Sequence, residues 1–121
     1  MRIYVSHSRA LNFEEELYKP LEEYAIASGH QFIFPHDISM SDYPSRSLFE
    51  SRGCDMVLAE VSLPSTGQGI ELGWANTFGV RIIAVHKAGS TVSSSLSHVT
   101  KDSFEYKNSA ELIYKLSKIL K

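Results

Sequence analysis

The stretch CDMVLAEVSLPSTGQGIELGWA, residues 54–75, decides the fold. Its part DMVLAEV, at 55–61, is a nearly continuous apolar run, as expected of a strand that is buried on both faces. The turn-forming segment PSTGQG, at 64–69, follows this strand and leads into an apolar stretch. We expect that stretch to form a helix that starts near Gly69 and ends around Gly79. A buried strand, a glycine-containing loop and a helix in this order are typical of a parallel sheet covered by helices.

The rest of the chain repeats this alternation. Apolar runs predict further strands at 2–6, 31–35 and 81–86, in a sheet of about five strands. Helical stretches separate the strands, so we expect an α/β fold with mostly parallel strands and helices on both faces. This is a Rossmann- or flavodoxin-like sandwich. No internal repeat or linker divides the chain, which favours one domain over residues 1–121.

Local signals predict where the helices begin and end. Asn12 and Glu15 have the spacing of a helix cap and its return partner, and Gly29 is expected to end that helix. Pro20 predicts a break or kink in the same helix, because proline removes a backbone donor. Asn108 opens a last helix with one apolar face.

Composition excludes several classes of function. The formal net charge of −2 provides no basic face, so we expect no nucleic-acid partner. The five histidines show no metal-binding spacing, and we expect no metal site. Cys54 is the one cysteine, which excludes an intrachain disulfide and fits a small core residue in a reducing compartment. With no apolar run of about 20 residues and no signal peptide, we expect a cytoplasmic protein without membrane contact.

Polar loops follow the predicted strands. Ligands of parallel sheets bind beyond the carboxyl ends of the strands, where the strand order reverses. That rule selects SHSRALN at 6–12, PHDISMSDYPS at 35–45 and SLPSTGQG at 62–69, with KAGSTVSSSLSH at 87–98 after the next strand. All four loops are rich in hydroxyl, glycine or histidine residues, so we expect the ligand site among them.

Glu71 is the first candidate for chemistry. In the first turn of a helix, a carboxylate lies in the positive end of the helix dipole, which favours its ionised form and suits a nucleophile. Gly67 and Gly69 would let a ligand approach the backbone closely. The alternative is structural, because acids are favoured in first helical turns whatever their function.

Other loop residues suit an anion. PSTGQG, at 64–69, combines hydroxyls, glycines and a helix N-terminus, but it lacks the lysine and spacing of a P-loop. It binds a phosphate or a sugar, or it is an ordinary turn. Arg9 could hold a phosphate by two hydrogen bonds, or it is solvated. His36 and Asp37 could contact a ligand, or His36 bonds only to the backbone.

The sequence resembles a known family. The block 54–75 is similar to the central signature of the nucleoside 2-deoxyribosyltransferase superfamily, nearest to its 2′-deoxynucleoside 5′-phosphate N-hydrolase branch. CDMVLAEVS matches the third strand of that family, PS-x-G-x-G the loop after it, and ELGWA the following helix. IYVSHSR, at 3–9, fits the first strand and loop. The resemblance covers essentially the whole chain, as one nucleoside 2-deoxyribosyltransferase-like domain, and is specific in 54–75.

The resemblance implies a mechanism. Glu71 corresponds to the nucleophile of the family, which attacks C1′ of a deoxyribosyl group through an oxocarbenium-like transition state. The base leaves and a glycosyl ester of the enzyme remains. Water then completes a hydrolase reaction, and a second base completes a transferase reaction. Tyr4 matches an active-site tyrosine, and no cofactor is implied.

The resemblance also implies a phosphate site. Ser65 corresponds to a phosphate-binding serine of the hydrolase branch, and Ser8 and Arg9 fall in its N-terminal phosphate loop. Ser94 resembles a phosphate ligand that the neighbouring subunit donates, which implies a homodimer. Its register among the serines at 93–95 is open.

One position departs from the family. Members that resemble this chain carry an aspartate shortly before the third strand, where this sequence has Ser47. A serine cannot act as a carboxylate acid or base. Either Asp42 or Glu50 substitutes from nearby, or the activity is altered or lost.

These observations order the possible functions. The first is hydrolysis of the N-glycosidic bond of 2′-deoxynucleoside 5′-monophosphates, because hydroxyls and Arg9 near the presumed 5′ end favour a phosphate. The second is base exchange on free deoxynucleosides. A nucleotide-binding module without catalysis stays open because of Ser47. An interaction domain of related topology is last, since it leaves GIELGWA, at 69–75, without a role.

Overall fold

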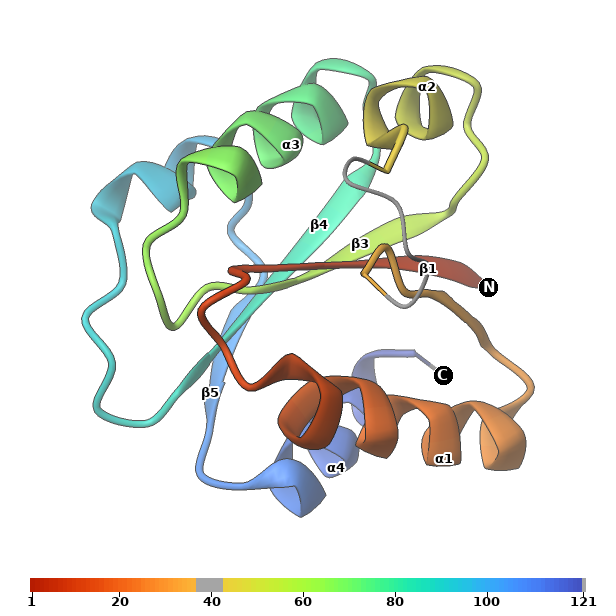
Figure 1. Cartoon of the computed structure of the whole chain (residues 1–121), viewed down its shortest axis with the longest axis vertical. Helices are drawn as coiled ribbons and strands as arrows, with labels where there is room; N and C mark the ends of the chain where they lie inside the picture. The colour runs from red at the N-terminus through yellow and green to blue at the C-terminus, as the bar shows by residue number, and fades with distance from the viewer. Residues whose placement is uncertain (37–42, 121) are drawn as a thin grey trace.

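The computed structural model describes residues 1–36 and 43–120 and has the predicted α/β fold. Its one sheet has the strand order β2-β1-β3-β4-β5, and every neighbouring pair is parallel (Figure 1). The strands are β1 (Arg2–His7), β2 (Gln31–Ile33), β3 (Met56–Glu60), β4 (Arg81–Lys87) and β5 (Ser103–Tyr106).

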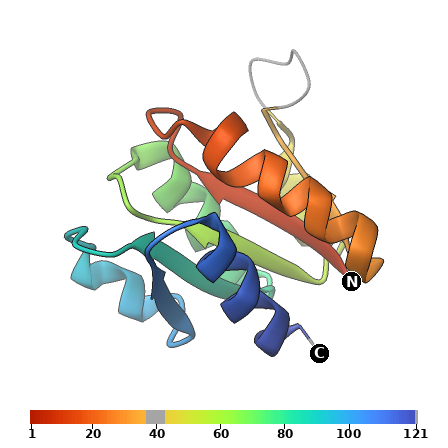
Figure 2. The same cartoon turned by 90° about the horizontal axis from the view of Figure 1, so that it is seen from below.

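Helices cover both faces of the sheet, as expected. Figure 1 shows α2 (Ser45–Glu50) and α3 (Thr66–Thr77) above the sheet and α1 (Lys19–Ser28) and α4 (Ser109–Ile119) below it. Figure 2 shows α1 and α4 side by side on their shared face. Two short helical segments complete the described chain: the π-helical η1 (Glu14–Tyr18) runs into α1, and the 3-10 helix η2 (Ser94–His98) lies between β4 and β5.

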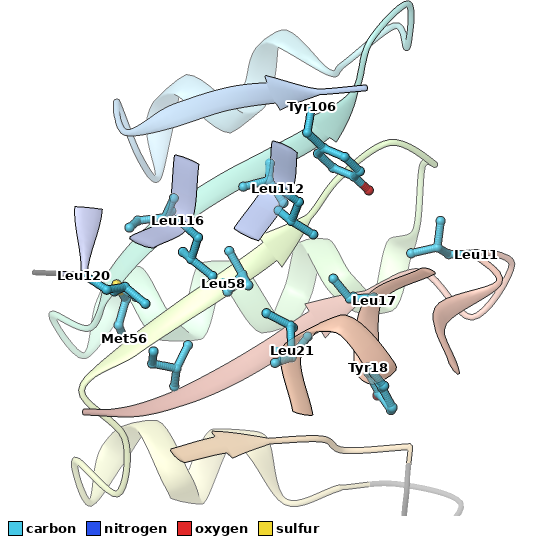
Figure 3. Packing of buried hydrophobic residues seen from close by; sticks show 14 residues of the cluster. Leu11, Leu17, Tyr18, Leu21, Met56, Leu58, Tyr106, Leu112, Leu116 and Leu120 are labelled. Atoms are coloured by element: carbon cyan, nitrogen blue, oxygen red, sulfur yellow. The ribbon is translucent and has the colours of Figure 1, made fainter. Parts of the chain in front are cut away.

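The two-residue period of the strands divides the core into two clusters. In β1, Ile3 and Val5 pack on the α1/α4 face, whereas Tyr4 packs on the α2/α3 face. Figure 3 shows the α1/α4 cluster, where leucines of both helices meet apolar side chains of the central strands. Cys54 is buried in the α2/α3 cluster, as predicted for a small core residue.

The topology creates a crevice beside β1. The chain leaves β1 to form β2 on one side and later returns to form β3 on the other side. Helices that connect such strands cover opposite faces of the sheet, so their loops separate at the carboxyl ends of β1 and β3. The loops that follow these two strands contain Ser8, Arg9 and Ser65.

The start of α3 corrects the sequence prediction. The helix begins at Thr66 rather than near Gly69, because the Ser65 side chain caps it by accepting a hydrogen bond from the Gln68 N–H at 3.3 Å. It ends at Thr77, shortly before Gly79. Glu71 therefore lies in the second helical turn, and the prediction of a first-turn acid was wrong.

The first helical region differs from its prediction in two respects. No side-chain bond caps η1, which follows Phe13, so the predicted cap by Asn12 was wrong. Pro20 does not interrupt the helical segment: η1 passes directly into α1, with Tyr18 and Lys19 both in the right-handed helical region, and the change from π-helical to α-helical bonding next to Pro20 is the one trace of the predicted break. Gly29 ends α1 with a left-handed φ of 78°, as predicted.

Candidate active site

A cavity of about 600 Å³ lies at the carboxyl edge of the sheet. The loops after β1, β2 and β3 form it together with one side of α3, so the three loops selected from the sequence do meet. Its walls are made by Tyr4, His7, Ser8, Arg9, Ala10, Pro35, His36, Tyr43, Ser45, Pro64, Ser65, Gly67, Gln68, Ile70, Glu71 and Trp74.

Glu71 is held by two hydroxyl groups of β1. The Tyr4 hydroxyl donates to Glu71 Oε2 at 2.6 Å, and the Ser6 hydroxyl donates to Glu71 Oε1 at 2.7 Å. Tyr4 and Ser6 are two residues apart, so they project from the same face of the strand toward α3. Each carboxylate oxygen thus has one donor, and the carboxylate has a fixed orientation at the cavity wall.

Tyr4 is a fixed donor. Its ring is buried between Tyr43, at 5.6 Å, and Phe49, at 5.2 Å between ring centroids. Burial, and then the Glu71 carboxylate, raise the pKa of the Tyr4 hydroxyl above its ordinary range, although a hydrogen bond from Ser45 opposes this. The hydroxyl therefore keeps its proton and its bond to Glu71 throughout the neutral pH range.

The first turn of α3 faces the cavity with small groups. Ser65 uses its oxygen as a helix cap, and its hydroxyl hydrogen remains available to a ligand. A Cβ atom at Gly67 would meet no protein atom within 4 Å, so packing does not require glycine there. Backbone N–H groups at a helix start are ready donors for an anion. This wall of the cavity can hold a negative group.

A buried chain of hydrogen bonds connects the loops after β1 and β2. His7 Nδ1 donates to the Ser8 carbonyl at 2.8 Å, and its Nε2 lies 2.6 Å from the Tyr18 hydroxyl, which also accepts the His36 N–H. Burial lowers the pKa of His7 to about 4, so the neutral ring accepts from Tyr18. Burial, and then Arg9, also lower the pKa of His36.

The structure brings most of the sequence-predicted residues together. Seven of them line the cavity: Tyr4, Ser8, Arg9, His36, Ser65, Gly67 and Glu71. Gly69 lines a different cavity on the other side of the helix start, and Ser94 lines neither of the two. Asp42 and Asp37 lie outside the described residues.

Ser47 does not face the cavity. In α2 the buried positions are Ser45 and Phe49, one helical turn apart, and Ser47 between them is exposed. Glu50, proposed from the sequence as a substitute acid, is exposed as well and does not line the cavity. The α2 residue that reaches the cavity is Ser45.

Sequence reasoning missed several residues of the site. Ser6 could have been found, because the strand period places it on the face of Tyr4. Tyr43 before α2, Ser45 in α2 and Trp74 in α3 needed the fold, since they reach the cavity from separate parts of the chain. His7 lies in the predicted loop at 6–12, but no sequence pattern assigns it a role, because its bond to Tyr18 depends on the packing of η1.

A second carboxylate lies on the opposite face of the sheet. Glu60, at the end of β3, is 1% exposed and accepts hydrogen bonds from the Ser62 N–H, the Ser62 hydroxyl and the Tyr106 hydroxyl. The Gln68 side chain donates to the Glu60 carbonyl at 2.9 Å. These bonds fix the loop after β3, and Glu60 does not line the cavity.

The second cavity shares a wall with the first. It measures about 550 Å³, lies between the start of α3 and the segment 91–99, and is mostly apolar. Pro64, Ser65 and Gln68 line both cavities.

In the described part of the chain, no three His, Cys, Asp or Glu residues are placed to hold a metal ion. Nor is any helix there long and apolar enough to cross a membrane.

Solved structures share this fold. No family model matches the sequence, and neither does any curated protein. The structure of the CMP N-glycosidase of Clostridium botulinum is similar, with a TM-score of 0.65 and 21% identity over 97% of this chain and 99% of that chain. The structure of the 2-deoxyribosyltransferase of the psychrotolerant bacterium Bacillus psychrosaccharolyticus is also similar, with a TM-score of 0.62 and 19% identity over 92% of this chain and 90% of that chain. The chain therefore has the same fold as two enzymes that bear these names.

Proposed function

We propose that this chain is an N-glycosidase of the nucleoside 2-deoxyribosyltransferase superfamily, acting on 2′-deoxynucleoside 5′-monophosphates. The observation that carries the proposal is the Glu71 carboxylate, held at the cavity wall by Tyr4 and Ser6. The names of the two structural neighbours, a CMP N-glycosidase and a 2-deoxyribosyltransferase, support N-glycosidic chemistry. The sequence motif at 54–75 supports the same superfamily.

Glu71 acts as the nucleophile in this proposal. Its carboxylate attacks C1′ of the sugar as the bond from C1′ to the base nitrogen breaks, and the nitrogen keeps the electron pair and takes a proton from solvent water. Tyr4, through its bond to Oε2, holds the carboxylate in the attacking orientation, which removes much of the entropic cost of the encounter. Water then attacks C1′ and releases Glu71.

The 5′-phosphate binds at the start of α3. Ser65, the N–H groups near Gly67, and Ser8 and Arg9 of the loop after β1 line that end of the cavity. The positive end of the helix dipole favours a phosphate there. Glu71, one turn further along α3, then lies near the sugar. His36, after β2, contacts the part of the substrate beyond the sugar.

Two further assignments belong to the proposal. Ser94 is the residue that a neighbouring subunit donates to the phosphate, so the active form is a homodimer. Its exposure and its position outside the cavity of its own chain fit this role. The reaction requires no cofactor.

Two alternatives have specific support. Base exchange by a deoxyribosyltransferase is favoured by the similarity to the Bacillus enzyme. A nucleotide-binding module without catalysis is favoured by the exposed Ser47, and by the fact that Glu71 is the one acid among the described residues that line the cavity.

One experiment separates the three functions. Release of free base is measured from the four deoxynucleoside monophosphates, the four deoxynucleosides and CMP, with and without an acceptor base, for the wild type and Glu71→Gln. The hydrolase releases base from monophosphates without an acceptor and loses this activity in the variant. Release that needs an acceptor indicates the transferase. Binding without release, unchanged in Glu71→Gln, indicates the module.

A further inference from the structure

We propose that Ser6 is a positioning residue that acts through Glu71 and accelerates breakdown of the glycosyl–enzyme ester by donating its hydrogen bond to Glu71 Oε1. This inference rests on the proposed function, because it concerns the fate of the intermediate on Glu71. It assigns the two hydroxyl groups on the carboxylate to different steps of the reaction.

The two oxygens of Glu71 have different surroundings. Ser6 is fully buried and does not line the cavity, so Oε1, its acceptor, is directed toward the sheet. Tyr4 is equally buried but lines the cavity, so we place its acceptor Oε2 on the cavity side. Oε2 is therefore the oxygen that bonds to the sugar, and Oε1 becomes the carbonyl oxygen of the ester.

The second step returns charge to Oε1. Water attacks C1′, the bond from C1′ to Oε2 breaks, and its electron pair returns to the Glu71 carboxylate while one proton of the water passes to solvent. Oε1 is neutral in the ester and shares the negative charge again in the products. A hydrogen bond to an ionised acceptor is roughly twice as strong as one to a neutral acceptor. The Ser6 bond therefore strengthens as the ester breaks, which favours release.

The opposite effect applies to the first step. A donor on the free carboxylate withdraws charge from the nucleophile, so removal of the Ser6 hydroxyl does not weaken the attack of Oε2. The packing around position 6 lets this be tested, because Ser6 is held within the paired part of β1 and its Cα neighbour in β3 is the small residue Ala59. A serine-to-alanine change there removes one oxygen and adds no volume.

The test compares Ser6→Ala with Ser6→Cys and Ser8→Ala. Base release is followed with the monophosphate that the wild type cleaves fastest, and the enzyme is quenched with acid during turnover for intact-mass measurement of the sugar-phosphate adduct. For Ser6→Ala we expect kcat to fall about 10-fold, KM to fall with it, kcat/KM to stay within about 2-fold, and the adduct fraction to rise several-fold. Slower breakdown of an intermediate lowers kcat and KM together.

The two other variants sharpen the assignment. Ser6→Cys keeps a weak donor of similar size, so its kcat and adduct fraction should lie between those of Ser6→Ala and the wild type. Ser8→Ala removes a hydroxyl from the phosphate loop. For this variant we expect a higher KM and an adduct fraction equal to that of the wild type. If a thermal melt shows that Ser6→Ala has a much lower melting temperature than the wild type, the kinetic comparison is made with Ser6→Cys alone.

Each outcome has one meaning. A fall in kcat/KM for both position-6 variants without extra adduct overturns the inference and leaves Ser6 a structural role. Unchanged kcat with unchanged adduct overturns it as well, and in both cases base release by the wild type leaves the proposed function standing. No base release by the wild type overturns both proposals.

Discussion

Two carboxylates of this protein have nearly the same partners and opposite situations. Glu71 accepts from a tyrosine and a serine on the α2/α3 face of the sheet, and Glu60 accepts from a tyrosine and a serine on the α1/α4 face. Glu71 is half-buried at a cavity wall, whereas Glu60 is 1% exposed and lines neither cavity. Hydroxyl donors alone do not make a reactive carboxylate; access decides which of the two can meet a substrate.

The comparison divides the polar residues by face. Those that face α3 hold a group that can react, and those that face α1 and α4 hold the backbone in place. Substitutions on the first face should therefore change turnover with little change in stability. Substitutions on the second face should do the reverse.

The largest effect is expected at Glu71. Glu71→Gln keeps the size of the side chain and a carbonyl acceptor but removes the nucleophile, so base release should fall by about 1000-fold or more. The free energy of unfolding should change by less than about 1 kcal/mol, because both partners are hydroxyl groups and one of them can turn to accept from the new amide. Activity assays and urea denaturation of the same preparation check both statements. A large loss of stability in this variant would show that Glu71, like Glu60, has a structural role.

The next effect is a pH dependence of stability from His7, on the α1 side. Its pKa is about 4 in the folded chain against 6.5 ordinarily, so the unfolded chain binds a proton more readily between these values. This contribution is complete above pH 6.5 and lost as pH falls toward 4, in total about 3 kcal/mol. Urea denaturation at pH 7 and pH 4 should show a smaller loss in His7→Gln than in the wild type. Equal losses would contradict the prediction.

Glu60→Gln should destabilise the protein without removing its chemistry. The carboxylate accepts from three donors, and an amide in its place presents its own N–H groups to one of them. Leaving a buried donor without its acceptor costs about 1–3 kcal/mol. A thermal melt measures the loss, and base release well below the melting temperature should stay within several-fold of the wild type. A 1000-fold loss of release would place Glu60 in the reaction.

The smallest effect is expected from glycine-to-alanine changes in α3, which distinguish a loss of ligand binding from a change in helix stability. Gly67→Ala and Gly73→Ala should each stabilise the helix by about 0.5–1 kcal/mol, since neither Cβ would meet another group within 4 Å. Only Gly67 lines the cavity, so only Gly67→Ala should weaken nucleotide binding, which calorimetric titration measures. Equal affinities in the two variants would remove Gly67 from the binding surface.

Much of the fold was predictable because it rests on local patterns. The buried strands β3 and β4 are continuous apolar runs, and the end of α1 at Gly29 follows from a single residue. The β5 strand was not located, because its four residues include two exposed polar positions and its pairing with β4 is long-range. The start of α3 was missed because glycines at 67 and 69 suggested a loop, whereas the Ser65 cap begins the helix before them.

The site was predictable where a motif supported it and not where tertiary packing decides. Glu71, Ser65 and Tyr4 come from recognisable stretches, and all three reach the cavity. Ser47 was chosen by counting along the chain. The rotation of α2 turns it outward and brings Ser45 inward, and that rotation depends on how Phe49 packs against Tyr4.

The anchoring of the loop after β3 has a practical consequence for engineering. Glu60 and Ser62 fix its beginning, and the Gln68 side chain ties the start of α3 back to Glu60. Residues 63–66 lie between these fixed points, and Pro64 and Ser65 among them border both cavities. A combinatorial library confined to 63, 64 and 66 would change the second cavity, which all three residues line, and through Pro64 the wall that it shares with the active-site cavity. Every anchor and the helix cap would be kept, so this segment is suited to changing which ligands the two cavities accept.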